Sequence, residues 1–105
     1  MFWSFNKEKR DEQRYIDALR AKFANRSRSE LIGIYNDLLR LKKCLDNSAV
    51  AEKKEAYAKS RDEQLSLLTT QIAATMVQEE IAMKYPFSIS SKYLHHDIAY
   101  LRNLI

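Results

Sequence analysis

The chain has 105 residues, of which 46% are hydrophobic and 30% are charged, a balance typical of one soluble globular domain that excludes a wholly disordered chain. The formal net charge is +4, and it lies in the first quarter, where residues 1–28 hold eight Lys or Arg against four Asp or Glu. A charge this small does not by itself indicate a polyanionic partner. With a single Gly and a single Pro, turn signals are scarce, so the composition favours a few long helices.

The single cysteine, Cys44, excludes an intrachain disulfide and suits a reducing compartment. The first ten residues, MFWSFNKEKR, lack the apolar stretch of roughly 7–15 residues that secretion requires. No other stretch approaches the ~18 apolar residues of a membrane span. We therefore expect the protein in the cytoplasm.

The first predicted helix begins near Asn6 and ends near Asn25, where the apolar pattern stops. Its apolar residues Ile16, Leu19 and Phe23 follow helical spacing, which predicts one buried face.

The second predicted helix begins at Ser27, because Ser27 and Glu30 have the spacing of a capping box, in which the Ser hydroxyl accepts a hydrogen bond from the backbone of Glu30. A heptad seam follows the cap and predicts a helix packed lengthwise against others. The seam consists of Leu31, Ile34, Leu38, Leu41 and Leu45. We expect a short connection at residues 46–48, where Asn47 ends one helix and Ser48 caps the next.

If it is unbroken, the third predicted helix runs from about Ala49 to Lys84. At ~1.5 Å per residue it would be about 54 Å long and would bend or project beyond its shorter neighbours. Its second half carries an apolar stripe that two glutamates, Glu79 and Glu80, interrupt. The stripe consists of Leu65, Leu68, Ile72, Met76 and Met83.

Tyr85 and Pro86 end this helix, since proline disfavours helical geometry in the residue before it. After an extended link over residues 87–90, Ser90 or Ser91 caps a final helix of about fourteen residues. Together the elements predict an all-α fold, a four-helix antiparallel bundle with a long third helix. Residues 1–105 form a single domain, for which we expect self-association.

Three groups of residues resemble chemistry-bearing sites, and each lacks a necessary partner. The run 95–97, His-His-Asp, has no metal ligand at i+3 or i+4, as a helical zinc site requires. Glu79 and Glu80 lack the Glu-x-x-His spacing of di-iron bundles, and Cys44 has no neighbouring base. We therefore expect no enzyme activity, no catalytic residue, no metal and no cofactor.

One basic run has no acid between Asp17 and Glu30, and it ends at the start of the second predicted helix, where free backbone amides favour anions. The run consists of Arg20, Lys22, Arg26 and Arg28. It is a candidate contact for a nucleic-acid phosphate. The alternative is a solvated basic corner whose cations pair with acids of the third predicted helix.

Three aromatic residues, Phe2, Trp3 and Phe5, are unusual at a chain terminus, where they would be exposed if left free. Four surfaces are candidates to cover them: the protein's own helices, a second copy, a groove in a partner, and a membrane interface. The last would be helped by nearby basic residues.

The sequence therefore predicts a non-enzymatic protein-binding or regulatory module that acts through helix–helix contacts, with itself as one expected partner in a homodimer. Two alternatives stay open. One is nucleic-acid binding through the basic quarter, and the other is peripheral membrane association through the aromatic N-terminus.

Overall fold

The computed structural model describes residues 2–85, 87, 89 and 91–105, with side chains described from residue 7 onward. Within these residues there are four α-helices and no strand, so the predicted all-α class is confirmed. The helices are α1 (Phe2–Phe23), α2 (Arg28–Glu55), α3 (Arg61–Lys84) and α4 (Leu94–Leu104), with a short 3-10 helix, η1 (Ser91–Tyr93), leading into α4.

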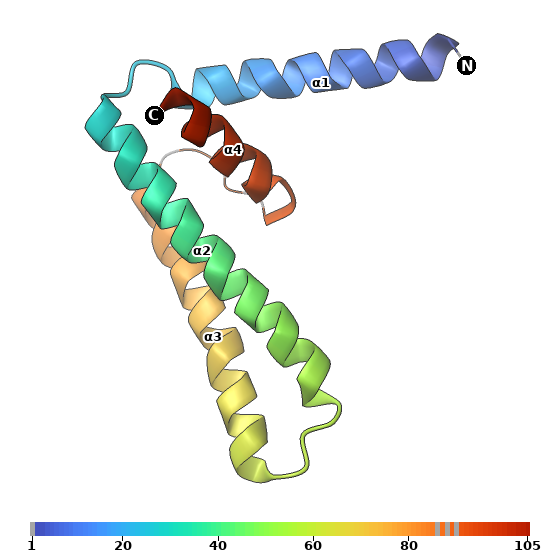
Figure 1. Ribbon diagram of the computed structural model, residues 1–105, viewed down its shortest axis with the longest axis vertical. Helices are drawn as coiled ribbons and strands as arrows, with labels where there is room; N and C mark the ends of the chain where they lie inside the picture. Colours follow the sequence, from blue (N-terminus) through green and yellow to red (C-terminus); the bar gives the residue numbers. More distant parts are fainter. Residues whose placement is uncertain (1, 86, 88, 90) are drawn as a thin grey trace.

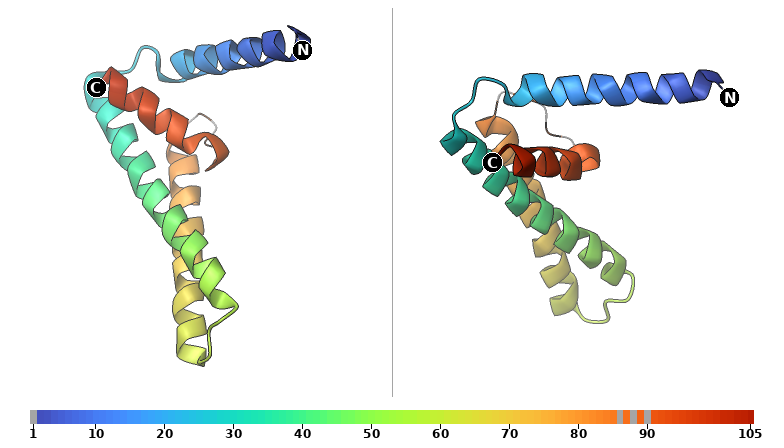
Figure 2. Two further views of the ribbon diagram at one scale, coloured as in Figure 1. Left: turned by 45° about the vertical axis from the view of Figure 1, so that its right-hand side comes forward. Right: turned by 45° about the horizontal axis from the view of Figure 1, so that its top comes forward.

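Helices α2 and α3 form a long antiparallel hairpin, as Figure 1 shows. Near the upper end of this hairpin α4 packs against α2, while α1 crosses above it and projects outward, so that the N-terminus lies far from the hairpin (Figures 1 and 2). The radius of gyration is 17.5 Å, against about 13 Å for a compact domain of this size. The molecule is therefore less compact than a typical domain of its size, and only one end of the hairpin is covered by other helices.

The hydrophobic core lies at this covered end, where α1, α2, α4 and the last turns of α3 meet. Its buried members are Leu19, Phe23, Ile34, Leu38, Leu41, Ile81, Leu94, Ile98 and Leu101. The heptad seam predicted for the second helix is confirmed at its centre, because Ile34, Leu38 and Leu41 are buried. Leu31 and Leu45, at the two ends of the seam, are partly buried against the same core.

The junction between α1 and α2 follows the predicted capping chemistry. The backbone N–H of Glu30 donates to the Ser27 hydroxyl at 3.1 Å. Asn25 has a φ of 60°, a left-handed conformation that Asn tolerates well and that ends α1. The Glu30 carboxylate lies 3.8 Å from the guanidinium of Arg26, where it forms an ion pair.

The predicted connection at residues 46–48 is wrong. Helix α2 continues through Asn47 and Ser48 to Glu55, and with 28 residues it is the longest helix in the part of the chain that the structure describes. No Gly or Pro lies between Asn47 and Glu55, and Ala51 is buried on the side of α2 that packs along α3. Helix propensity and this packing outweigh the weak tendency of Asn and Ser to end a helix.

The chain turns instead at residues 56–60, so residues 49–84 do not form one unbroken helix, a question that the sequence left open, and α3 has 24 residues. Ser60 caps α3, since the backbone N–H of Glu63 donates to its hydroxyl at 3.1 Å. The Glu63 carboxylate accepts in turn from the backbone N–H of Lys59 at 3.2 Å. Ser60 and Glu63 have the same spacing as Ser27 and Glu30, so the signal for this helix start was present in the sequence.

The end of α3 lies where the sequence predicted it, with Lys84 as the last helical residue. Asp37 of α2 fixes this end by accepting hydrogen bonds from the ammonium of Lys84, at 2.8 Å, and from the hydroxyl of Tyr85. The final helical segment starts at Ser91, and η1 and α4 together cover the fourteen residues expected. Ser91 is the first residue of η1 and does not cap α4, whose N-cap residue is Tyr93, without a side-chain hydrogen bond. The other predicted cap, Ser90, lies outside the described residues.

Candidate interaction surface

Helix α3 carries apolar side chains on two opposite faces. One face packs along α2, where Ala74 and Ile81 are buried and Leu67 and Val77 are partly buried. At about 100° per residue these positions share one side of the helix.

The opposite face carries the apolar stripe that the sequence predicted, and it points away from the molecule. We call this set the outer stripe. Its exposed fractions are 50% for Leu65, 48% for Leu68, 50% for Ile72, 64% for Met76 and 89% for Met83. All five side chains lie within about 40° of the direction of Ile72 around the helix axis. The outer stripe is therefore a narrow apolar line parallel to the axis of α3.

The outer stripe is uncovered because the other helices lie elsewhere. Figures 1 and 2 show α1 and α4 at the upper end of the hairpin, while most of α3 extends below them. The side of α3 that faces α2 is already occupied by that helix. In the described part of the chain, none of the helices combines the length and apolar character needed to cross a bilayer.

Two opposite charges lie in line with the outer stripe, one before its first member and one between its last two members. Arg61 lies before Leu65 and Glu79 lies before Met83, each about 20° from the direction of Ile72 around the helix. Both residues are exposed, and neither forms an ion pair with another described residue. Glu80, beside the stripe, is paired with Arg40 of α2 at 3.0 Å.

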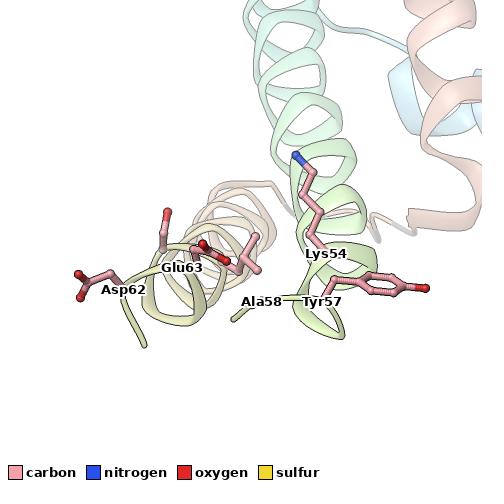
Figure 3. Close-up of a pocket in the computed structure, with 7 residues that line it drawn as sticks. Lys54, Tyr57, Ala58, Asp62 and Glu63 are labelled. Carbon is pink, nitrogen blue, oxygen red and sulfur yellow. The ribbon is translucent and has the colours of Figure 1, made fainter. Parts of the chain in front are cut away.

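An open pocket of about 600 Å³ lies at the tip of the hairpin, where α2 and α3 diverge (Figure 3). It is lined by Lys54, Tyr57, Ala58, Asp62, Glu63, Ser66 and Leu67. In Figure 3 the ring of Tyr57 points away from α3, and this residue is 82% exposed. The Glu63 carboxylate is already engaged by the backbone of the turn. The pocket therefore lacks a converging set of free polar groups that would fix a small ligand.

Lys22, one member of the basic run, is held inside the protein by a buried acid. Its ammonium lies 2.7 Å from the carboxylate of Asp97 on α4, and Asp97 is only 2% exposed. The Tyr15 hydroxyl donates to the same carboxylate at 3.3 Å. Burial, together with the charge of Asp97 and this hydrogen bond, raises the pKa of Tyr15 to about 12.

The rest of the basic run divides into two parts. Arg26 donates to the backbone carbonyl of Lys22 at 3.2 Å, and both cations lie over the ring of Phe87, at 5.2 and 4.9 Å from its centre. Arg20 and Arg28 are exposed and take no part in this cluster. The acids that pair with the run come from α2 and α4, not from α3. The anion contact predicted for these four residues remains a prediction, with Arg20 and Arg28 its accessible members.

The histidines form a small aromatic group with Tyr15. The rings of His95 and His96 are 3.9 Å apart, and His96 lies 5.4 Å from Tyr15 in an edge-on arrangement. No set of three or more metal-ligating side chains comes together among the described residues. Cys44 is half-buried in α2.

The three N-terminal aromatic residues belong to helix α1 by their backbone, but the side chains of Phe2, Trp3 and Phe5 lie outside the described ones. The following residues, 7–14, are exposed along the projecting half of α1. Which surface covers the aromatic side chains thus remains a prediction.

Asp97 is the residue that sequence reasoning missed. It lies in line with Leu94, Ile98 and Leu101, the buried face of α4, and an acid on such a face requires a buried cation or hydrogen-bond donors.

Comparison with known proteins found no matching family model, no matching curated protein and no matching solved structure.

Proposed function

We propose that this chain is a small non-enzymatic protein-binding or regulatory module that packs the outer stripe of α3 against a helix of another chain. The observation that supports the proposal is the exposure of five large apolar side chains in one line, on a helix whose opposite face is already packed. Apolar lines of this kind on soluble proteins typically mark interaction sites, because burying them releases water from apolar surface.

The shape of the outer stripe suits a helical partner. From Leu65 to Met83 it extends over 18 residues, or about 27 Å at ~1.5 Å per residue. A second helix laid along this line would contact every member of the stripe. Two of those members are methionines, whose flexible side chains adapt to a partner's surface.

The charge of α3 argues against a lipid surface as the occupant of the stripe. The helix carries four acids and two bases. Interfacial helices are instead rich in Lys and Arg, which attract anionic lipids. Because the lone Cys44 suits a reducing compartment, we propose the cytoplasm as the setting.

The proposal is tested by affinity capture from the native host followed by mass spectrometry, with three proteins compared. The wild type and Val50→Glu should capture the same partner, and Ile72→Glu should lose it. Val50 is the matched control, because it is a β-branched residue on α2 with an exposed fraction of 51%, against 50% for Ile72. A partner that Ile72→Glu still captures at the wild-type level would contradict a binding role for the outer stripe.

A different result would favour the nucleic-acid alternative. Fluorescence anisotropy with a labelled duplex, at roughly 50 to 200 mM salt, measures phosphate binding through its steep salt dependence. We expect no such binding. Salt-sensitive binding that is lost in Arg20→Glu and Arg28→Glu variants would favour nucleic-acid binding through the basic run as the function.

A further inference from the structure

We infer that the occupant of the outer stripe is a second copy of this chain, whose α3 packs antiparallel to the first about a two-fold axis that passes between Leu68 and Ile72. This inference rests on the proposed function, since it names the partner for the same surface. Three features of α3 support it: the spacing of the stripe, the positions of its charges, and the length over which no other helix of the chain covers its outer face.

The spacing of the stripe allows two straight helices to remain in contact. From Arg61 through Leu65, Leu68 and Ile72 the steps are four, three and four residues, and the same steps recur from Ile72 through Met76 and Glu79 to Met83. This eleven-residue repeat has ~3.67 residues per turn, close to the ~3.6 of an α-helix, so the line hardly drifts around the axis. Two copies can therefore pack along the line without strong supercoiling.

The charges of the stripe are complementary to themselves in one orientation only. Arg61 and Glu79 are 18 residues apart, and the midpoint between them is residue 70. In an antiparallel pair centred there, Arg61 of each copy lies opposite Glu79 of the other, which forms two identical ion pairs, as a two-fold interface requires. A parallel pair would instead place Arg61 against Arg61 and Glu79 against Glu79, and like charges repel.

The same register aligns the apolar residues. In this register Leu68 of one copy lies opposite Ile72 of the other, and Leu65 lies one residue from the position opposite Met76, whereas Met83 lies beyond the start of the partner's α3. Arg61 and Glu79 are both exposed and free of ion pairs with other described residues in the single chain, so dimerisation breaks no existing pair. Glu80 can keep its contact with Arg40.

The length of the contact sets the expected affinity. In the register centred on residue 70, residues 61–79 of the two α3 helices overlap, or about 28 Å at ~1.5 Å per residue. A contact along one helix pair this short is small beside the ~1,200–2,000 Å² buried in stable complexes. We therefore expect a reversible dimer with a dissociation constant on the order of micromolar.

The first experiment measures mass against concentration by sedimentation velocity on the full chain. The wild type should change from the 12.4 kDa of one chain to twice that mass as its concentration rises through the micromolar range. Ile72→Glu should remain monomeric, and Val50→Glu should dimerise as the wild type does. Circular dichroism on each variant verifies that helix content is unchanged.

The second experiment tests the orientation by charge reversal. Arg61→Glu replaces the cation opposite Glu79 by a second carboxylate at both ends of an antiparallel dimer, and it should weaken dimerisation about tenfold. The double variant Arg61→Glu with Glu79→Arg recreates both ion pairs and should restore the wild-type affinity. A single reversal without effect would overturn the antiparallel arrangement.

The inference and the proposed function fail in different ways. A wild type that stays monomeric at the highest concentration would overturn the second copy as partner, as would a dimer that Ile72→Glu does not weaken. If the protein is monomeric yet Ile72→Glu alone loses a captured host protein, the proposed function stands and the inference fails. If Ile72→Glu weakens neither dimerisation nor the capture of a host protein, the inference and the proposed function both fail.

Discussion

At the scale of single residues, the buried carboxylate of Asp97 decides what Lys22 does. An acid that is 2% exposed requires a compensating cation, and Lys22, at 2.7 Å, supplies it from α1. The hydroxyl of Tyr15 adds a second donor from the same helix. Lys22 therefore joins α1 to α4, and its charge is used within the protein.

Replacing Lys22 by Ala should lower the free energy of unfolding by about 3–5 kcal/mol, because it leaves the buried carboxylate of Asp97 without a cation. Chemical denaturation of the two proteins measures the difference. Arg20→Ala is the matched control, since Arg20 is an exposed cation on the same helix, and it should change stability by less than about 0.5 kcal/mol. Equal effects of the two substitutions would contradict a structural role for Lys22.

Asp37, which holds the end of α3 against α2, makes the stability of the protein depend on pH in the acid range. Burial alone would raise the pKa of Asp37, but hydrogen bonds from Lys84 and Tyr85 and the charges of Lys84 and Arg40 outweigh it and lower that pKa below its ordinary value of 3.8. A lowered pKa in the folded state means that Asp37 contributes stability above pH 3.8, and that this contribution disappears as the pH falls further. Asp37→Asn should therefore be less stable than the wild type at neutral pH, with a difference that narrows below pH 3.8.

Denaturant titrations at several pH values measure this difference. Asp46→Asn serves as the control, because Asp46 forms an exposed pair with Lys42 within one helix. Such pairs contribute little, so the control should lose less stability at neutral pH. If the free energies of unfolding of Asp37→Asn and the wild type differ by the same amount across the acid range, the pH-dependent contribution of the Asp37 carboxylate is contradicted.

At the scale of elements, the turn between α2 and α3 is set by a cap. Asn47 and Ser48 are weak helix-ending signals, and α2 continues through them. At the start of α3, by contrast, the side chains of Ser60 and Glu63 together accept hydrogen bonds from backbone N–H groups. Two reciprocal contacts outweigh a single weak preference. The hairpin, and with it the length of the outer stripe, therefore depends on residues 59–63.

Ser60→Ala should destabilise the protein by about 1 kcal/mol, because an N-terminal backbone amide of α3 loses its acceptor. Thermal unfolding followed by circular dichroism measures the effect. Ser29→Ala provides the comparison, since Ser29 is exposed in the first turn of α2 and its hydroxyl does not cap that helix. A cap role for Ser60 would be refuted if both substitutions had the same effect.

The seam of α2 supplies the centre of the hydrophobic core. Leu38 is fully buried at the centre of the core, so Leu38→Ala should cost about 2–5 kcal/mol through lost burial and a residual cavity. The adjacent Leu39 is 36% exposed and gives a control of the same chemistry. Leu39→Ala should cost clearly less in the same thermal melts. A Leu38→Ala change under about 0.5 kcal/mol would place Leu38 on the surface.

At the scale of the whole molecule, the core occupies one end of the α2–α3 hairpin. The extents are 51 × 43 × 21 Å, and the core cluster lies where four helices meet, whereas the lower hairpin buries only Ala51 and Ala74 among the described residues (Figure 1). Stability should therefore be graded along the hairpin, and the outer stripe crosses its less stable part.

Amide hydrogen exchange at dilute concentration should show this gradient. Amides between Ile34 and Leu41, and between Ile98 and Leu101, should exchange slowest, because opening them requires breaking the core. Amides of residues 61–70 should exchange faster, since local opening of the hairpin end exposes few buried side chains. Uniform protection along α2 and α3 would show that the hairpin opens as one unit.

Sequence by itself determined what local chemistry controls. The apolar spacing identified the seam of α2 and the members of the outer stripe, Ser27 identified a helix start, and Tyr85 with Pro86 identified a helix end. Each of these depends on residues within a few positions of one another. Only the tertiary structure decided which apolar face of α3 is buried, because the buried face is the one that contacts residues of α2, which are distant in the sequence. It also decided that Lys22 meets Asp97, 75 residues away, since one sequence does not reveal which charges the packing of distant helices brings together.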